Sequence, residues 1–336
     1  MTERSKRPRR LRASRAIRAM SREARVHPAQ LILPLFLVEG DDAREPIDAL
    51  PGVDRLSIDA ASGVIDRAMS HGILGFALFP RIDKSQKTVD GSSALRDDSL
   101  ACRAIQTLSR RFPEAAFIAD VALDPYSSFG HDGIVRDGRV INDETVDVLA
   151  AMAVLMAEAG AAIVAPSDMM DGRVGAVRSA LERAGLHDTV IMSYAAKYAS
   201  AFYGPFREAL GSMPVVADGV PSNKRTYQMD PANADEAIRE AALDLEEGAD
   251  ILLVKPGLPY LDVVRTLATT FEAPVAAYHV SGEYAMLRAA ADRGLIDFRH
   301  ALVESLTCLV RAGARQVLTY AAIEAAAFLQ SEGVDD

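Results

Sequence analysis

Eight short apolar runs recur along the chain, and segments with apolar residues at helical spacing lie between them. Uninterrupted apolar runs of this length are typical of strands buried on both faces of a parallel sheet. Eight alternations of strand and helix predict an α/β fold, a single (β/α)8 barrel. The predicted strands are 31–38, 73–79, 116–123, 161–166, 189–194, 249–255, 274–280 and 316–320.

An open, doubly wound sheet is the alternative, but no Gly-x-Gly-x-x-Gly motif follows the first run. The amphipathic segments 99–112, 146–159 and 234–247 exemplify the predicted helices. Asn233 precedes the third of these, and Glu236 follows three residues later, a pattern that predicts Asn233 as the N-cap.

One segment, 203–233, breaks this rhythm, because glycine and proline recur throughout it. It lies between the fifth and sixth predicted strands, so it would overhang the mouth formed by the carboxyl ends of the barrel strands. We interpret it as a mobile lid over that mouth. A disordered insertion is the alternative.

The size and composition of the chain fit a globular protein. Its 336 residues, 49% of them hydrophobic, suit one large domain or two small ones. No apolar run approaches the ~18 residues that span a membrane, and the N-terminus lacks the apolar core of a secretory signal. The two cysteines, Cys102 and Cys308, match no zinc or redox spacing, so we expect a reduced, cytoplasmic protein.

Charge is divided unevenly along the chain. Residues 1–25 contain ten Lys or Arg and two Glu, which leaves −18 on the remainder of a chain whose net charge is −10. We expect residues 1–27 to form an arm that associates with the acidic barrel domain, 28–336, of another copy. Nucleic-acid binding and an organelle transit peptide are alternatives, but the body offers no basic patch to extend a nucleic-acid footprint.

Two lysines follow adjacent predicted strands. Lys255 ends the sixth strand, immediately before Pro256, and Lys197 follows the fifth. In barrels of this kind the active site lies at the carboxyl ends of the strands. Burial and a second ammonium group both lower the pKa of a lysine and favour the neutral amine, the nucleophile in Schiff-base chemistry. The pair also suggests that two carbonyl compounds are handled together; solvated lysines that never meet are the alternative.

The lid would add groups suited to an acidic substrate. It carries Arg207, Lys224 and Gln228, and cationic or amide groups on a closing loop can grip a carboxylate. Neutral hydrogen bonds to a second carboxylate could come from Ser281 and Tyr278 at the end of the seventh predicted strand. Taken singly, each of these side chains has an ordinary structural reading.

Together these residues lie in motifs that resemble the porphobilinogen synthase family, also called 5-aminolevulinate dehydratase. The motifs span nearly the whole chain in family order, which makes the resemblance specific. They are 7–12 (Arg-Pro-Arg-Arg-Leu-Arg), 165–172 (Ala-Pro-Ser-Asp-Met-Met-Asp-Gly), 192–197 (Met-Ser-Tyr-Ala-Ala-Lys), 202–207 (Phe-Tyr-Gly-Pro-Phe-Arg), 253–262 (Leu-Val-Lys-Pro-Gly-Leu-Pro-Tyr-Leu-Asp) and 280–286 (Val-Ser-Gly-Glu-Tyr-Ala-Met).

The resemblance implies a (β/α)8 barrel whose arm embraces a neighbouring subunit, in octamers or alternatively hexamers. It also implies condensation of two 5-aminolevulinate molecules into porphobilinogen with loss of two waters, an early step of tetrapyrrole (haem) biosynthesis. Lys255 would form a Schiff base with the substrate that supplies the propionate side, and Lys197 would bind or activate the other. Ser281 and Tyr320 would hold the first carboxylate, with Tyr278 over that substrate. Arg207, Lys224 and Gln228 would hold the second carboxylate. Asp120 and Ser167 would line the pocket near the amino group, and Tyr203 and Phe206 would also contact substrate.

Some positions depart from the family pattern. Lys224 stands where many members have arginine, so it keeps the charge but loses the bidentate fork. Zinc-dependent relatives carry three cysteines where this chain has Ala122, Asp124 and Asp132. We therefore expect no catalytic Zn²⁺. Asp124 and Asp132 could instead hold a hard cation, including a monovalent one, or act as general acid–base groups.

This version resembles the magnesium-stimulated bacterial branch. In that branch a glutamate at the position of Glu240 holds an allosteric Mg²⁺ away from the active site, and an aspartate at the position of Asp171 lies nearby. We expect Mg²⁺ there, and a metal-independent enzyme is the alternative. Two other functions compete: a Schiff-base aldolase or keto-acid lyase that needs one lysine, and a catalytically silent barrel that would need neither.

Overall fold

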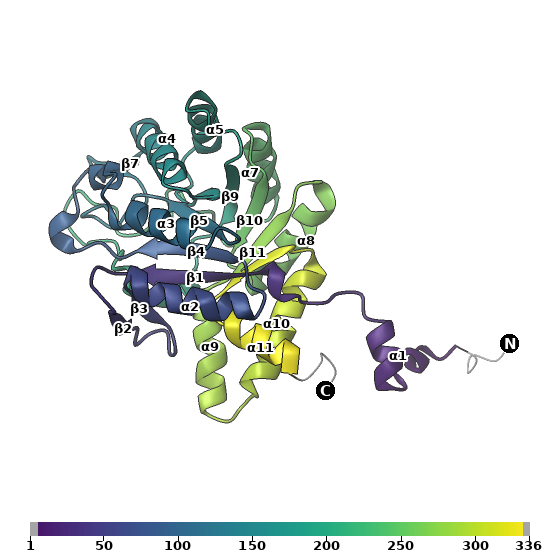
Figure 1. Cartoon of the computed structure of the whole chain (residues 1–336). Helices are drawn as coiled ribbons and strands as arrows, with labels where there is room; N and C mark the ends of the chain where they lie inside the picture. Colours follow the sequence, from purple (N-terminus) through teal and green to yellow (C-terminus); the bar gives the residue numbers. More distant parts are fainter. Residues whose placement is uncertain (1–5, 332–336) are drawn as a thin grey trace.

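Eight parallel strands close into a barrel (Figure 1). In this computed structural model, which describes residues 6–331, each strand pairs with the next and β12 returns to pair with β1. The predicted barrel is confirmed, and the open-sheet alternative is wrong. The barrel strands are β1 (Leu31–Leu37), β4 (Gly75–Pro80), β5 (Ala116–Val121), β8 (Ile163–Pro166), β9 (Val190–Lys197), β10 (Ile251–Lys255), β11 (Val275–His279) and β12 (Gln316–Thr319).

Helices cover the outside of the barrel and bury one apolar face against it. In α3, for example, the buried Leu100, Ala104 and Leu108 are spaced four residues apart along one side. The strands are buried on both faces, as the uninterrupted run of β1 illustrates. The outer helices are α2 (Ile58–Ser70), α3 (Leu100–Arg111), α4 (Asn142–Glu158), α5 (Arg173–Arg183), α7 (Asp235–Glu246), α8 (Leu261–Thr270), α9 (Ser281–Asp292), α10 (Phe298–Ala312) and α11 (Ala322–Ser331).

The register between β9 and β10 shifts by one residue near the mouth. From Ser193 to Ala196, β9 advances three residues while β10 advances two. Beyond the shift, Lys197 is the partner of Lys255. Because paired residues of parallel strands project from the same face of a sheet, the shift places both lysines on one side.

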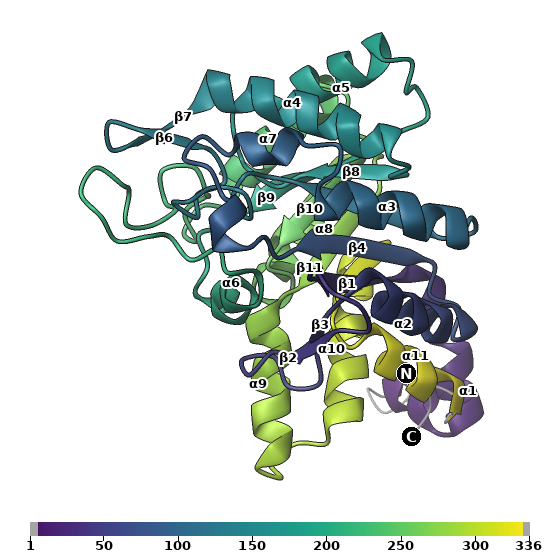
Figure 2. The same ribbon diagram turned by 60° about the vertical axis from the view of Figure 1, so that its left-hand side comes forward.

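Four short strands that the apolar pattern does not predict decorate the barrel. β2 (Arg44–Pro46) and β3 (Asp54–Leu56) extend the sheet beside β1, and β6 (Ile134–Arg136) and β7 (Arg139–Ile141) form a separate hairpin. Each is three residues long, too short to give a periodic signal. Figure 2 shows the β6–β7 hairpin beside the lid, at one end of the molecule.

The lid begins with a helix rather than a loop. Gly204–Leu210 form α6, which Pro205 can start because the first turn of a helix lacks amide partners anyway. Residues 211–233 form no further helix or extended strand. The predicted N-cap Asn233 is wrong: α7 begins one residue later, Ala234 is its N-cap, and the Asn233 amide donates instead to Glu236 at 2.9 Å.

The N-terminal arm projects from the barrel (Figure 1). It contains the short helices η2 (Pro8–Arg12) and α1 (Arg15–Met20), neither of which has a buried residue. Two of its apolar side chains, Leu11 and Met20, are 61% and 84% exposed. Residues 1–5 of the predicted arm lie outside the described residues. Within the described part of the chain, no helix is long and apolar enough to cross a membrane.

Candidate active site

A small cavity at the carboxyl ends of the strands collects most of the predicted site residues. Its volume is about 20 Å³, room for roughly one water and too little for a substrate molecule. Strands β4, β5, β9 and β10, the loops that follow β5 and β8, and the lid all contribute side chains to it. The wall consists of Phe79, Asp120, Asp124, Asp132, Ser167, Lys197, Tyr203, Phe206, Arg207, Lys224, Gln228 and Lys255.

Lys255 is buried among aromatic rings. Its Nζ lies 4.7 Å from the ring centroid of Tyr278, 4.8 Å from Phe206, 5.1 Å from Tyr203 and 5.3 Å from Tyr194. These rings exclude water, and burial lowers the pKa of Lys255 to about 7, helped by the positive charge of the other lysine. A substantial fraction of neutral amine is therefore present near neutral pH.

Two lysines and two aspartates form a charged cluster in the cavity. Lys197 Nζ lies 3.6 Å from Asp132 Oδ1 and donates to the carbonyl oxygen of Ser167. Lys224 Nζ lies 3.3 Å from Asp132 and 3.5 Å from Asp124 Oδ2. Burial opposes ionisation of Asp132, but the charges of Lys197 and Lys224 hold the pKa of its carboxyl well below its usual range. Asp132 is thus an anion that compensates two buried cations.

Asp120 behaves in the opposite way. Burial, and then the charge of Asp124, raises the pKa of Asp120 to about 7. Its Oδ1 is buried without a hydrogen-bond partner, as is Oε1 of Gln228 across the cavity wall. Buried polar atoms are normally paired, so these two acceptors mark places where a ligand would donate hydrogen bonds.

Three predicted binding residues lie beside the cavity rather than on its wall. The Tyr278 ring faces Lys255, and its hydroxyl is 3.0 Å from that of Tyr320. Ser281 Oγ donates to the carbonyl oxygen of Phe202 at 3.2 Å. In the closed conformation their hydroxyl groups are thus engaged within the protein, and their roles toward a substrate stay predictions.

His131, on the loop between β5 and β6, joins the barrel to the lid. Its Nε2 lies 2.8 Å from the carbonyl oxygen of Pro221, which can only accept, so Nε2 carries a proton and donates. Its Nδ1, which carries no proton, accepts from the Tyr227 hydroxyl at 2.9 Å. The oxygen of that hydroxyl accepts in turn from the Asp132 backbone N–H at 3.3 Å. Burial lowers the pKa of His131. A neutral imidazole therefore links the barrel to the lid, and we call its contacts with Pro221 and Tyr227 the clasp.

Sequence reasoning does not single out Phe79, Tyr194 or His131. Phe79 lines the cavity and packs edge-on against Phe206, with centroids 5.2 Å apart. The ring of Tyr194 approaches the Nζ atoms of both lysines, at 5.3 Å from Lys255. Phe79 and Tyr194 do fall at or near the ends of predicted strands, which is the signal that could have identified them.

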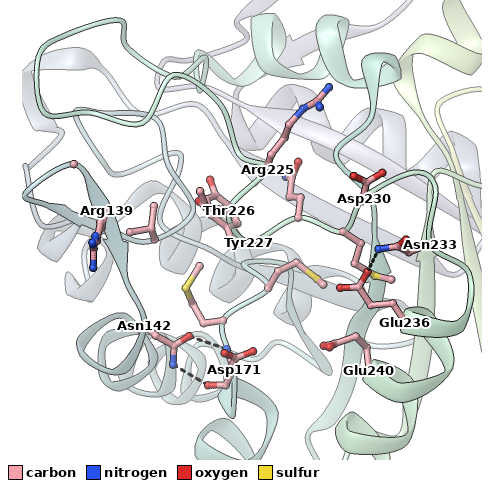
Figure 3. Close-up of a pocket in the computed structure, with 16 residues that line it drawn as sticks. Arg139, Asn142, Asp171, Arg225, Thr226, Tyr227, Asp230, Asn233, Glu236 and Glu240 are labelled. Carbon is pink, nitrogen blue, oxygen red and sulfur yellow. Dashed lines mark hydrogen bonds between the residues drawn. The ribbon is translucent and has the colours of Figure 1, made fainter.

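A second, larger pocket lies between the β6–β7 hairpin, the end of the lid and α7 (Figure 3). It has a volume of about 640 Å³, and its wall includes Asp171 and Glu240. Burial raises the pKa of Glu240, and the charges of Asp244 and Asp171 add to the shift. No group of three or more His, Cys, Asp or Glu that could hold a metal occurs in the described part of the chain. A cation here would therefore rely on one or two carboxylates and water, an arrangement that suits Mg²⁺.

The closed barrel, with charged and polar side chains gathered at the carboxyl ends of its strands, has the arrangement of a barrel enzyme. Comparison with known families narrows this class. The model of the delta-aminolevulinic acid dehydratase family matches residues 5–328, and the chain belongs to that family.

Individual relatives match this chain over most of their length. The chain is 53% identical to the delta-aminolevulinic acid dehydratase of Bradyrhizobium diazoefficiens over 327 residues, which cover 97% of this chain and 92% of the relative. It is 52% identical to the chloroplastic enzyme of Chlamydomonas reinhardtii, over 97% of this chain and 85% of the relative. The crystal structure of the Toxoplasma gondii enzyme, in complex with the reaction product porphobilinogen, superimposes with a TM-score of 0.93 at 49% identity. That match covers 96% of this chain and 91% of the other.

Proposed function

We propose that Lys255 is the nucleophile with which this chain condenses two molecules of 5-aminolevulinate into porphobilinogen. The chain is a hydro-lyase of tetrapyrrole biosynthesis, and the reaction releases two waters. The observation that carries the role of Lys255 is its burial among four aromatic rings, which leaves much of the amine neutral near pH 7. The neutral amine adds to the keto carbon of one substrate, and loss of the carbonyl oxygen as water leaves a C=N bond.

The charged residues around Lys255 would bind the second substrate, transfer protons and balance the buried charges. Lys197 would bind or activate the second substrate, since it ends the adjacent strand. Asp120, with a pKa of about 7, can both give and take a proton near neutral pH. Asp124 and the ionised Asp132 balance the two buried cations.

The carboxylate of the second substrate would bind at the wall of the cavity that the lid supplies, whereas Ser281 and Tyr320 would hold that of the first. Arg207 lines the cavity, and its guanidinium carbon lies 5.8 Å from the ring centroid of Tyr203. Lys224 and Gln228 line the same cavity, and all three residues arrive on the lid. Closing the lid would therefore bring the carboxylate-binding groups to the cavity and exclude water from it in a single motion.

Borohydride trapping tests this assignment. Reduction in the presence of 5-aminolevulinate should fix one substrate on Lys255, as peptide mass spectrometry would show. Lys255→Ala should lose that label and lower turnover by roughly 10³-fold or more. Lys84→Ala removes an exposed lysine and serves as the control, with turnover unchanged. Wild-type turnover in folded Lys255→Ala protein would contradict the proposal.

We also propose that Mg²⁺ binds in the pocket of Figure 3, held by Glu240 with Asp171 nearby. The raised pKa of Glu240 supports this, because a cation would relieve the crowding of carboxylates there. Calorimetric titration should show Mg²⁺ binding that Glu240→Ala abolishes. Glu246→Ala, on an exposed position of the same helix, should leave it intact. Equal Mg²⁺ affinity in both variants would exclude Glu240 as a ligand.

The residues at the zinc positions of relatives suggest that the active site needs no Zn²⁺. With Ala122, Asp124 and Asp132 there, a strong zinc chelator should leave turnover intact. Activity that is lost and returns only with Zn²⁺ would overturn this view. We further infer that the enzyme is a cytoplasmic homo-oligomer, an octamer or alternatively a hexamer.

A further inference from the structure

Glu283 is a buried carboxylate that lies outside the cavity and has no part in the reaction proposed above. It is 1% exposed and stands in the first turn of α9, two residues after Ser281. Gly282 separates it from Ser281, the predicted carboxylate-binding serine. A buried anion requires partners, and those of Glu283 show what it does.

The carboxylate bridges two loops that end adjacent barrel strands. Its Oε2 accepts from the backbone N–H of Val280, at 2.7 Å, in the usual manner of a helix-capping glutamate. Its Oε1 accepts from the N–H of Leu258 at 2.7 Å, and Oε2 also receives a longer bond of 3.4 Å from Gly257. Gly257 and Leu258 follow Lys255 by two and three residues. The second pair of bonds therefore reaches beyond the helix, to the loop that fixes the Schiff-base lysine.

The same helical turn is tied to the start of the lid. Ser281 Oγ donates to the carbonyl of Phe202 at 3.2 Å and accepts from the N–H of Phe206 at 3.1 Å. Gly282 packs so closely that a Cβ would come within 2.6 Å of the Phe202 carbonyl oxygen. Glu283 thus lies at a junction of three elements, which carry Lys255, Ser281 and Phe206.

The arrangement of donors around Glu283 suits an ionised carboxylate better than a protonated carboxylic acid. Its three partners are all backbone N–H groups, which can only donate. Burial raises the pKa of Glu283 to about 7, and these three bonds oppose the shift. The amino end of α9 also favours a negative charge. An uncharged side chain of the same size could not satisfy all three donors.

We propose that Glu283 is a positioning residue, which holds the loop after Lys255 and the start of α9 at a fixed separation. It keeps the amine of Lys255 aligned with Ser281, the residue predicted to hold the carboxylate of the first substrate. This role rests on the proposed function of Lys255. It adds a residue that touches no substrate and still sets the rate at which the Schiff base forms.

Glu283→Gln tests the role with little change in size. The glutamine amide has one oxygen that can accept and one NH₂ that cannot, so it cannot satisfy all three N–H donors. Borohydride trapping of 5-aminolevulinate on Lys255 should slow on the order of 10- to 100-fold, since small misplacements of reacting groups cost that much. Hydrogen exchange at the Leu258 amide should accelerate, because its acceptor is lost, and kcat should fall more than KM rises.

The matched control is Asp297→Ala, which removes the N-cap carboxylate of α10, an acceptor for the His300 N–H at 2.9 Å. It should lower thermal stability and leave the trapping rate unchanged. Folded Glu283→Gln protein that traps substrate at the wild-type rate would overturn the inference. If the Gln variant does not fold, Glu283→Asp keeps the charge on a shorter arm, and wild-type trapping there would overturn it equally. Failure of wild-type protein to be trapped at Lys255 would instead refute the proposed function.

Discussion

At the scale of single residues, the enclosure of Lys255 explains its chemistry better than its place in the sequence does. Four aromatic rings surround the amine, and the largest contribution to its lowered pKa is burial, with the charge of Lys197 second. The three nearby aspartates oppose the shift but do not cancel it. An aldehyde or ketone that reaches this amine therefore meets a nucleophile with much of its population deprotonated near neutral pH.

The lowered pKa has a consequence for stability with a definite sign. Below about pH 7 Lys255 is protonated in both the folded and unfolded chain, so the cost of burying its charge is present in full. Between about 7 and 10.5 the unfolded chain binds the proton and the folded chain does not, so the cost disappears as pH rises.

Lys255→Met should therefore raise the melting temperature most at about pH 6, and this gain should shrink toward about pH 10. Thermal denaturation across that range would measure it. Lys84→Met, at an exposed position, should show little change. A gain for Lys255→Met that did not vary with pH would mean that packing, not charge, dominates at this position.

The reactive side chains at strand ends could be predicted, whereas those that shape their environment could not. Lys197 and Lys255 stand out because charged residues rarely end an apolar run. Tyr194 and Phe79 read as ordinary core residues, since aromatic side chains are common in strands. His131 gives no local signal, because its partners Pro221 and Tyr227 lie about 90 residues away in the sequence.

At the scale of elements, the lid segment 203–233 is tied to the barrel at several points, including the bond from the Val215 N–H to the Phe129 carbonyl and the ion pairs of Lys224. The bonds of His131 join it to the barrel near Asp132, and the cavity beneath has room for only about one water. Opening must break these bonds each time substrate enters or product leaves. The clasp should therefore tune substrate capture more than the chemical step.

Tyr227→Phe tests the clasp. It removes the hydroxyl that pairs with His131 and accepts from the Asp132 N–H, and leaving buried partners unsatisfied costs about 1–3 kcal/mol. We expect KM to rise several-fold with a smaller change in kcat, and limited proteolysis within 211–223 to quicken. Tyr260→Phe, at a half-buried tyrosine outside the lid, is the control. If neither KM nor proteolysis changes in Tyr227→Phe, the clasp does not hold the lid.

Long apolar elements were predictable, and short or polar ones were not. All eight barrel strands follow apolar runs, because a strand buried on both faces must be apolar throughout. The β6–β7 hairpin and α6 are short, and α6 begins at a glycine and a proline that resemble loop residues. The predicted N-cap of α7 is wrong by one residue because the Asn233 side chain bonds to the side chain of Glu236 rather than to the helix backbone.

At the scale of the whole molecule, the arm and the barrel have complementary charges. Residues 1–25 are strongly basic and the rest of the chain is acidic. The arm helices bury nothing within their own subunit, and the arm exposes Leu11 and Met20. Apolar side chains on an extended, charged arm are best satisfied by another copy.

Removing residues 1–20 should therefore reduce the proposed homo-oligomer to smaller species, as analytical ultracentrifugation would show. Raising the salt concentration should weaken the full-length assembly, because exposed charges are screened. Leu295→Ala changes an apolar side chain, 68% exposed, on the α9–α10 turn and should preserve the assembly mass. An unchanged mass after arm removal would show that the subunits associate through other surfaces.

The register shift between β9 and β10 has a further consequence. If the same sequence paired without the shift, Lys255 would lie opposite Ala196, and Lys197 would project from the opposite face of the sheet. Inserting one alanine between Ala196 and Lys197 would leave both lysines in the sequence, yet it would turn the side chain of Lys197 to the opposite face and leave one amine in the site. The capacity to gather two carbonyl compounds is thus encoded in the length of a strand as much as in the identity of any side chain.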